Sequence, residues 1–129
     1  MPQYLVAIQH HEHYELPDPE AMIREIKALN LEMIAAGVRD FAGGLQPVGK
    51  AKSVRPQAGG ELVVSDGPYL EAKEHVGGLW LLKCVDMDEA VEWARKAAVA
   101  CRVPVEVREF LEIPKAWKAE PDRESWGKK

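Results

Sequence analysis

The chain has 129 residues, of which 47% are hydrophobic and 29% charged, and its formal net charge is -4 at pH 7. This length and composition are typical of one globular domain that folds without disulfides or a structural metal. A domain that binds nucleic acid usually carries a clustered basic excess, so the acidic balance argues against binding to DNA or RNA.

The start of the chain predicts one strand and one helix. Residues 4–8 are a short apolar run, interpreted as a buried strand that the polar segment 10–17 ends. Asp18 then provides an N-cap, and Pro19 fits the first helical position, where its missing N–H costs nothing. Gly37 suits the left-handed conformation that ends a helix. The apolar side chains in between recur at helical spacing and are Met22, Ile23, Ile26, Leu29, Met33 and Ile34.

The middle of the chain predicts several strands around a hairpin. The pair Gly43-Gly44 is interpreted as a bulge or bend, and residues 56–60 are interpreted as a turn. Residues 66–68 are interpreted as a corner that ends the preceding strand. The strands expected between these breaks are residues 38–41, 50–55, 61–65 and 79–85. The last of them is the most apolar run in the chain and is short enough for a central strand.

A second helix is expected to begin at Asp86, whose side chain can cap it, with Glu89 three residues later as in a capping box. Its expected buried face consists largely of small side chains, which let a helix lie close to a sheet. These residues are Ala90, Val91, Ala94, Ala97, Ala98 and Cys101. Residues 105–110 then alternate between apolar and charged side chains, which predicts a half-exposed last strand.

The order β-α-β-β-α-β describes a ferredoxin-like α+β sandwich with an extra β-hairpin. We expect a four-stranded antiparallel sheet, with helices near residues 19–36 and 87–101 packed on one face. The other face would be open, although apolar residues of the 79–85 strand point to both sides. A second copy of the chain is the simplest partner that could cover this open face. We therefore predict a homodimer that buries this face or closes a dimeric α/β barrel.

The chain ends in a charged, proline-containing tail, residues 114–129, which follows the domain of residues 1–113. We expect this tail to lie across its own domain or a partner through Trp117 or Trp126. No window of the sequence approaches the ~18 apolar residues of a membrane span, and no leader is visible. A cytoplasmic protein is therefore expected.

The cysteines and the remaining tryptophans fit a core better than a reactive site. Cys84 and Cys101 lie in apolar surroundings outside any CxxC or Cys/His cluster, so core packing is favoured over a disulfide or a reactive thiol. Trp80 and Trp93 are interpreted as core or dimer-interface residues rather than as platforms on which a ligand stacks.

Residues 64–78 resemble the signature of the YCII-related, or DGPF-domain, family. The usual signature reads DGPFAETKE followed by a glycine pair and an apolar strand, and this chain has DGPYLEAKE followed by Gly77 and Gly78. The shared signature residues are Asp66, Gly67, Pro68, Glu71, Lys73 and Glu74. Similar flanks extend the resemblance over residues 39–110.

The resemblance implies a dimeric ferredoxin-like fold but no particular reaction. Most members of the family have no assigned reaction, and they often occur beside, or fused to, extracytoplasmic-function sigma factors. The wider superfamily includes small oxygenases and isomerases that use no cofactor. A His–Asp pair proposed for the YCII branch cannot be placed here, because the first helix carries no histidine and no Asp-Pro follows the second. Whether the chain is an enzyme stays open.

The ionisable residues of the signature are the first part of a candidate site. Asp66, Lys73 and Glu74 are the candidate catalytic residues, and Glu71 and Lys73 are candidate ligand-binding residues. Closely spaced charges are a means by which enzymes shift pKa values, and Lys73 favours a small polar or anionic ligand. The alternative is structural. Asp66 then caps a turn, and the other charges form solvated ion pairs worth under ~1 kcal/mol.

The histidines of the run His10-His11-Glu12-His13 are the second part of the candidate site. His10 and His11 are candidate ligand-binding residues, because the end of the first strand and the segment entering the central strand can meet at one end of the sheet. His11 and His13 would suit a metal, but no third ligand stands at a defined spacing, so no metal is expected. No GxGxxG, Walker or CxxC motif is present, and no cofactor is expected.

Two functions from different classes are compatible with these residues. The first is a small-molecule-binding protein, with or without catalysis, whose pocket lies near the DGPY-x-E-x-KE segment. The second is a non-catalytic accessory or regulatory module that acts through an extracytoplasmic-function sigma factor. The sequence does not decide between them.

Overall fold

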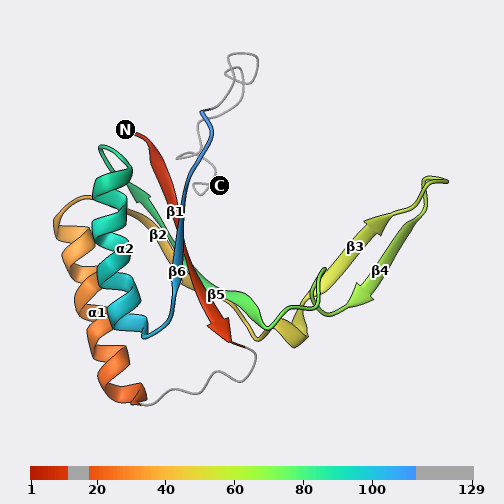
Figure 1. Cartoon of the computed structure of the whole chain (residues 1–129), viewed down its shortest axis with the longest axis horizontal. Coiled ribbons are helices and arrows are strands. Elements are labelled where there is room, and N and C mark those ends of the chain that lie inside the picture. Colours follow the sequence, from red (N-terminus) through yellow and green to blue (C-terminus); the bar gives the residue numbers. More distant parts are fainter. Residues whose placement is uncertain (12–17, 113–129) are drawn as a thin grey trace, which may run out of the picture.

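The computed structural model describes residues 1–11 and 18–112, and it confirms the expected α+β fold. Four strands form an antiparallel sheet in the order β2-β5-β1-β6, so β5 and β1 are central. Both helices lie on one side of this sheet, as predicted (Figure 1). The elements are β1 (Gln3–His11), α1 (Pro19–Ala35), β2 (Arg39–Gly44), η1 (Val48–Lys50), β3 (Lys52–Pro56), β4 (Leu62–Asp66), β5 (Glu74–Lys83), α2 (Met87–Cys101) and β6 (Val105–Glu109). The tail with Trp117 and Trp126 lies outside the described residues.

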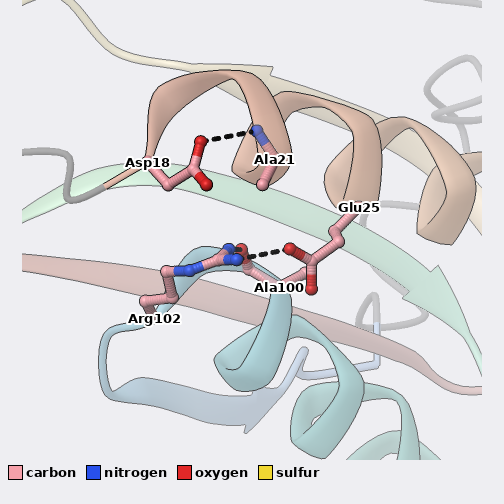
Figure 2. Close-up of polar contacts among 5 residues, drawn as sticks. All are labelled: Asp18, Ala21, Glu25, Ala100 and Arg102. Carbon is pink, nitrogen blue, oxygen red and sulfur yellow. Dashed lines mark hydrogen bonds and ion pairs between the residues drawn. The ribbon is translucent and has the colours of Figure 1, made fainter.

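Helix α1 begins and ends within one residue of its predicted limits. The Asp18 carboxylate accepts a hydrogen bond of 3.1 Å from the Ala21 backbone N–H (Figure 2). At the other end Gly37 has a φ of +72°, and its N–H donates to the Ile34 carbonyl at 3.0 Å. The N–H of the next residue donates to the Met33 carbonyl at 3.1 Å. These two bonds form a Schellman motif, which satisfies the last carbonyls of the helix.

Helix α2 has a modified capping box. Asp86 Oδ1 accepts from the Glu89 N–H at 2.9 Å, and the Glu89 carboxylate accepts from the Val85 N–H at 2.7 Å, one residue before the cap. The residue after the helix, Arg102, is left-handed with a φ of 58°. Its guanidinium donates to a carbonyl of α2 and forms an ion pair with Glu25 of α1, which joins the two helices (Figure 2). No described helix is long and apolar enough to cross a membrane.

The core lies between the helices and the inward face of the sheet. Alternate residues of β1, including Tyr4 and Val6, are almost fully buried there. The face of α2 that meets the sheet consists of small side chains, as predicted. Its buried residues are Ala90, Ala94, Ala97, Ala100 and Cys101. Val91 and Ala98, which were expected on this face, are only partly buried, because the buried stripe passes through Ala100 instead.

Trp80 and both cysteines belong to this core. The Trp80 indole N–H donates to Asn30 Oδ1 at 2.9 Å, so the buried ring has a polar partner on α1. Cys84 and Cys101 are buried, and neither forms a disulfide. Burial raises the pKa of each thiol to about 11, which favours the unreactive protonated form. Trp93 is partly buried beside the core, with the Lys96 ammonium 5.0 Å from its ring centre.

Two strands of the sheet differ from their expected limits. β1 continues to His11, so the interpretation of segment 10–17 as a break is wrong for His10 and His11. These residues extend the strand because they pair with the start of β5, which satisfies their backbone whatever their side chains are. Gly43 and Gly44 lie within β2 and pair with β5, and the irregularity in β2 falls nearer its start instead.

The side of the sheet away from the helices, called the outer face here, is apolar at its centre. Its residues are Leu5, Ala7, Phe41, Leu79 and Leu81. In β1 and β5 these residues alternate with buried ones, and Phe41 precedes Ala42, which packs against the core. Leu5 pairs with Leu81, Ala7 with Leu79, and Phe41 with Leu81, so these side chains are adjacent. Phe41 is 55% exposed. Both helices lie on the opposite side (Figure 1).

β3 and β4 form a separate antiparallel ribbon, called the arm here (residues 52–66), as the predicted hairpin requires. The arm projects away from the sheet and the helices (Figure 1). At its tip the Gln57 N–H donates to the Glu61 carbonyl at 2.7 Å, and Gly60 has a φ of +88°. Ser53, near the base, is the buried residue of the arm.

Candidate functional site

The end of β1 meets the start of β5 beside the candidate histidines. His10 is the cross-strand partner of His75, and His11 is the partner of Glu74. We expected the end of the first strand to approach the segment that enters the central strand, and the two segments are adjacent. This register places three imidazoles and one carboxylate at one end of the sheet, with the His10–His75 pair on one face of the strands and the His11–Glu74 pair on the other.

Gly77 makes room for the His10 side chain. The register of β1 and β5 shifts between Ile8 and Gln9, so that Gly77 is an extra residue in β5. A β-carbon on Gly77 would lie 2.0 Å from His10 Nδ1, which places the imidazole directly against the glycine backbone. The Gly77 carbonyl accepts from the Leu45 N–H at 2.9 Å, so its own backbone is held from the other side. A glycine at a bulge next to a site is a common means of aiming a side chain.

Burial also sets the ionisation of His10. The side chain is half-buried between β1 and the bulge, and this desolvation lowers its pKa below the ordinary value of 6.5. The imidazole is therefore neutral at pH 7. A neutral imidazole has one donor and one acceptor nitrogen.

The other signature residues lie in the segment between the arm and β5. Glu71 and Lys73 are exposed and precede the strand, and Glu74 is its exposed first residue. Lys73 and Glu74 are therefore neighbours of the histidine pair along the chain. The catalytic and ligand-binding roles predicted for these three residues stay predictions.

Asp66 is part of the arm. It is the last residue of β4 and forms an ion pair with Lys52, its cross-strand partner in β3. Both side chains are mostly exposed. Gly67 follows with a φ of +94°, and its N–H donates to the Ala51 carbonyl at 2.7 Å. These contacts agree with the structural interpretation of Asp66 as a residue that closes a turn, and its catalytic role stays a prediction.

Further contacts fasten the signature segment to the base of the arm. The Ser53 hydroxyl donates to the Gly67 carbonyl at 2.8 Å, and the Arg55 guanidinium donates to the Tyr69 carbonyl at 2.7 Å. The same guanidinium lies 4.9 Å from the centre of the Tyr69 ring. Arg55 and Tyr69 did not stand out in the sequence, because their contact depends on how the segment folds back along β3.

A cavity of about 290 Å³ lies at the opposite end of the sheet, where β1 begins and β6 ends. It is lined by Met1, Pro2, Gln3, Glu109, Phe110, Leu111 and Glu112. None of the predicted site residues is among them. No pattern in the sequence pointed to this cavity, because it forms only when the two ends of the domain meet.

The structure forms no group of three or more metal-ligating side chains among residues 1–11 and 18–112. Glu12 and His13, which complete the histidine run, lie outside those ranges. The expectation that no metal binds the histidine run stays a prediction.

Comparison with known proteins adds two findings. The sequence model of the YCII-related domain family matches residues 4–113. A protein of Rhizobium meliloti (strain 1021), described only as uncharacterized, is 35% identical to this chain over 78 residues. That match covers 60% of this chain and 62% of the relative, so the chain spans a little over three fifths of the relative's length.

Proposed function

The chain belongs to the YCII-related domain family, and on that premise we propose that it binds a small polar or anionic organic molecule beside the paired ends of β1 and β5. We assign His10, His11, Lys73 and Glu74 to this site. The observation that carries the proposal is the register that sets His10 opposite His75 and His11 opposite Glu74. This register gathers donors and acceptors next to a cationic side chain.

Each assigned residue has a chemical part in the proposed site. The His10 imidazole is neutral at pH 7, since burial lowers its pKa, and can therefore take part in a hydrogen bond without carrying a charge. Lys73 supplies a point charge that favours a carboxylate or a phosphate on the ligand. Glu74 supplies an acceptor, or a base if the bound molecule is acidic. A ligand with one anionic group and one hydroxyl or carbonyl would use Lys73 together with His10, because Glu74 pairs with His11 and so faces the other side of the strands.

Asp66 and Glu71 have smaller parts in this proposal than the sequence suggested. The Asp66 carboxylate pairs with Lys52 across the base of the arm, so we assign it to fixing the direction in which the signature segment leaves β4. Glu71 lies in the exposed segment before Lys73 and is a secondary ligand candidate. The cytoplasmic location expected from the sequence stays a prediction.

Titration with small anions tests the proposed site. Malonate and inorganic phosphate are added separately to the full chain, and the imidazole resonances of His10 and His75 are followed by NMR. We expect both resonances to shift with malonate, and Lys73→Ala to weaken binding about 10-fold, the loss typical of one charge-assisted hydrogen bond. Lys27→Ala, an exposed lysine on α1, is the matched control and should bind as the unmodified chain does.

Two results would refute the small-molecule proposal. One is that Lys73→Ala and Lys27→Ala bind both anions equally well, and the other is that neither imidazole responds to either anion. The regulatory alternative predicts no response to any small anion, together with capture of a purified extracytoplasmic-function sigma factor. The two functions are therefore distinguished by the same set of samples.

A further inference from the structure

The cavity lined by residues 1–3 and 109–112, called the end cavity here, has walls that backbone hydrogen bonds hold in place. The Phe110 N–H donates to the Gln3 carbonyl at 2.9 Å, which joins the two strand ends. On the other side of β1, the Cys84 N–H donates to the Pro2 carbonyl at 3.2 Å. The volume of about 290 Å³ is close to the lower limit of ~300–1,000 Å³ for ligand pockets. The end cavity therefore has the size for a small molecule.

The lining of the end cavity is richer in hydrogen-bond acceptors than in donors. Pro2 has no backbone N–H, and the N–H of Phe110 is used by the Gln3 carbonyl. The Gln3 side-chain amide donates to Asp40 Oδ2 at 2.8 Å, and Oδ1 of this carboxylate lies 3.6 Å from the Lys83 ammonium. A carboxylate only accepts, so the Gln3 amide nitrogen faces Asp40 and its other polar atom is an acceptor. These donors are therefore engaged within the chain.

The charge of the lining is negative. Glu109 and Glu112 both line the end cavity, and within residues 1–11 and 18–112 neither carboxylate forms an ion pair. Glu109 accepts a hydrogen bond of 3.2 Å from the Tyr4 hydroxyl, which leaves its charge in place. The two carboxylates outnumber the α-amino group of Met1. Arg108 precedes Glu109 in β6 and so projects to the other face of the strand.

The remaining lining is apolar, and much of it is accessible. It consists of Met1, Pro2, Phe110 and Leu111. Met1 is 73% exposed and Leu111 is 90% exposed, so a bound molecule would remove apolar surface from water. The aromatic ring of Phe110 also attracts a cation over its face. A molecule with a positive group and an apolar body therefore matches both parts of the lining.

We propose that the end cavity binds a small organic cation, in which a primary ammonium group is carried on a compact apolar or aromatic body. The ammonium donates to the carboxylates of Glu109 and Glu112, and the body lies against Phe110 and Leu111. This site is independent of the ligand site proposed above, because it lies at the opposite end of the sheet and uses other residues.

Three molecules of similar shape separate the effect of charge from that of the apolar body. Phenethylamine, 2-phenylethanol and phenylacetate are titrated separately into the full chain, and the resonances of Phe110 and Leu111 are followed by NMR. We expect phenethylamine to bind at least ~10-fold more tightly than 2-phenylethanol, the gain typical of one charge-assisted hydrogen bond. Phenylacetate should bind most weakly at these residues. Equal binding of the amine and the alcohol, or no response to the amine, overturns the proposal.

Charge-removing variants test the two carboxylates. Glu109→Gln with Glu112→Gln keeps an acceptor for the Tyr4 hydroxyl, and we expect it to bind phenethylamine no more tightly than 2-phenylethanol. Glu92→Gln with Glu106→Gln removes the same charge from exposed positions outside the cavity. This matched control should bind as the unmodified chain does. Equal losses in the two double variants would contradict the assigned residues, because the amine would then respond only to the net charge.

An indole of the tail is the competing occupant of the end cavity, and single substitutions in the full chain distinguish it from a free amine. We expect Trp117→Ala and Trp126→Ala to bind phenethylamine as the unmodified chain does. If either variant binds the amine at least ~10-fold more tightly, the proposal is overturned, because that tryptophan and not a free molecule then fills the cavity.

Discussion

The body of this protein and its arm are built from the same kinds of strand residue but differ in what holds them. Leu82 and Val6 in the sheet are fully buried under the helices, whereas Leu62 and Val64 in the arm are about two-thirds exposed. Both regions have antiparallel pairing, which a bulge at Gly77 interrupts in the body and which is uninterrupted in the arm. This difference indicates that cross-strand pairing is enough to give a ribbon its shape. The stability of the ribbon depends on a surface against which it can bury its apolar side chains.

The largest difference between the two regions is expected when one leucine in each region is replaced by alanine. Leu82→Ala should lower the free energy of unfolding by about 2–5 kcal/mol, because it leaves a cavity in a packed core. Leu62→Ala should cost less than about 0.5 kcal/mol in the monomer, because it removes surface that water already reaches. Urea denaturation at a protein concentration low enough to give a monomer measures both. Similar costs would mean that the arm packs on its own chain.

The next largest effect concerns a polar contact inside the body. Asn30 Oδ1 accepts from the Trp80 indole at 2.9 Å and from Arg39 at 3.1 Å. Asn30→Ala should destabilise the protein by about 1–3 kcal/mol, since it leaves a buried N–H without a partner. Asn30→Asp keeps the acceptor and should recover much of the loss in thermal denaturation. No recovery would show that packing, and not the hydrogen bond, explains the cost.

A smaller effect is expected at the bulge where the signature segment joins the body. Gly77→Ala places a methyl group on the His10 ring and should cost about 1 kcal/mol, because the ring can turn away but loses its packing. The penalty should largely vanish in a His10→Ala background, which a double-mutant cycle detects. Gly49→Ala, with nothing within 4 Å, is the matched control. Additive costs would contradict the contact.

The smallest effect is the pH dependence that His10 contributes. Burial lowers the pKa of His10 in the folded protein below 6.5, so the unfolded chain binds this proton more tightly. The stabilising contribution is therefore complete above about pH 6.5 and is lost as the pH falls toward the folded pKa. His10→Gln should flatten the stability curve in that window and leave it unchanged above it. An unchanged curve would place the ring in solvent.

The sequence predicted the body well because its signals are local. Asp18, Gly37 and Asp86 set the helix ends by hydrogen bonds within a few residues, and the small residues of α2 follow one helical stripe. The candidate site could be predicted only in part. His10 and His11 were correctly placed near the start of β5, but the bulge at Gly77 depends on a register that pairs residues far apart in the chain.

The arm shows the other limit of sequence analysis. Its strands and turn were predicted from β-branched residues and glycines, but nothing in the pattern told whether the ribbon lies on the sheet or away from it. Asp66 illustrates the consequence: its place in a family signature suggested a catalytic residue, and the structure pairs it with Lys52 at the base of the arm. Pairing within a hairpin is a local property, whereas the surface that covers the hairpin is not.

Backbone hydrogen exchange of the full chain, measured at a concentration low enough to give a monomer, tests the difference between the body and the arm. We expect the amides of β1 and β5 to be protected, because these strands pack under both helices. The amides of β3 and β4 should exchange at least ~10-fold faster, a factor that corresponds to about 1.4 kcal/mol less local stability. Equal protection of the two regions would contradict the account, because the arm would then be held as firmly as the body.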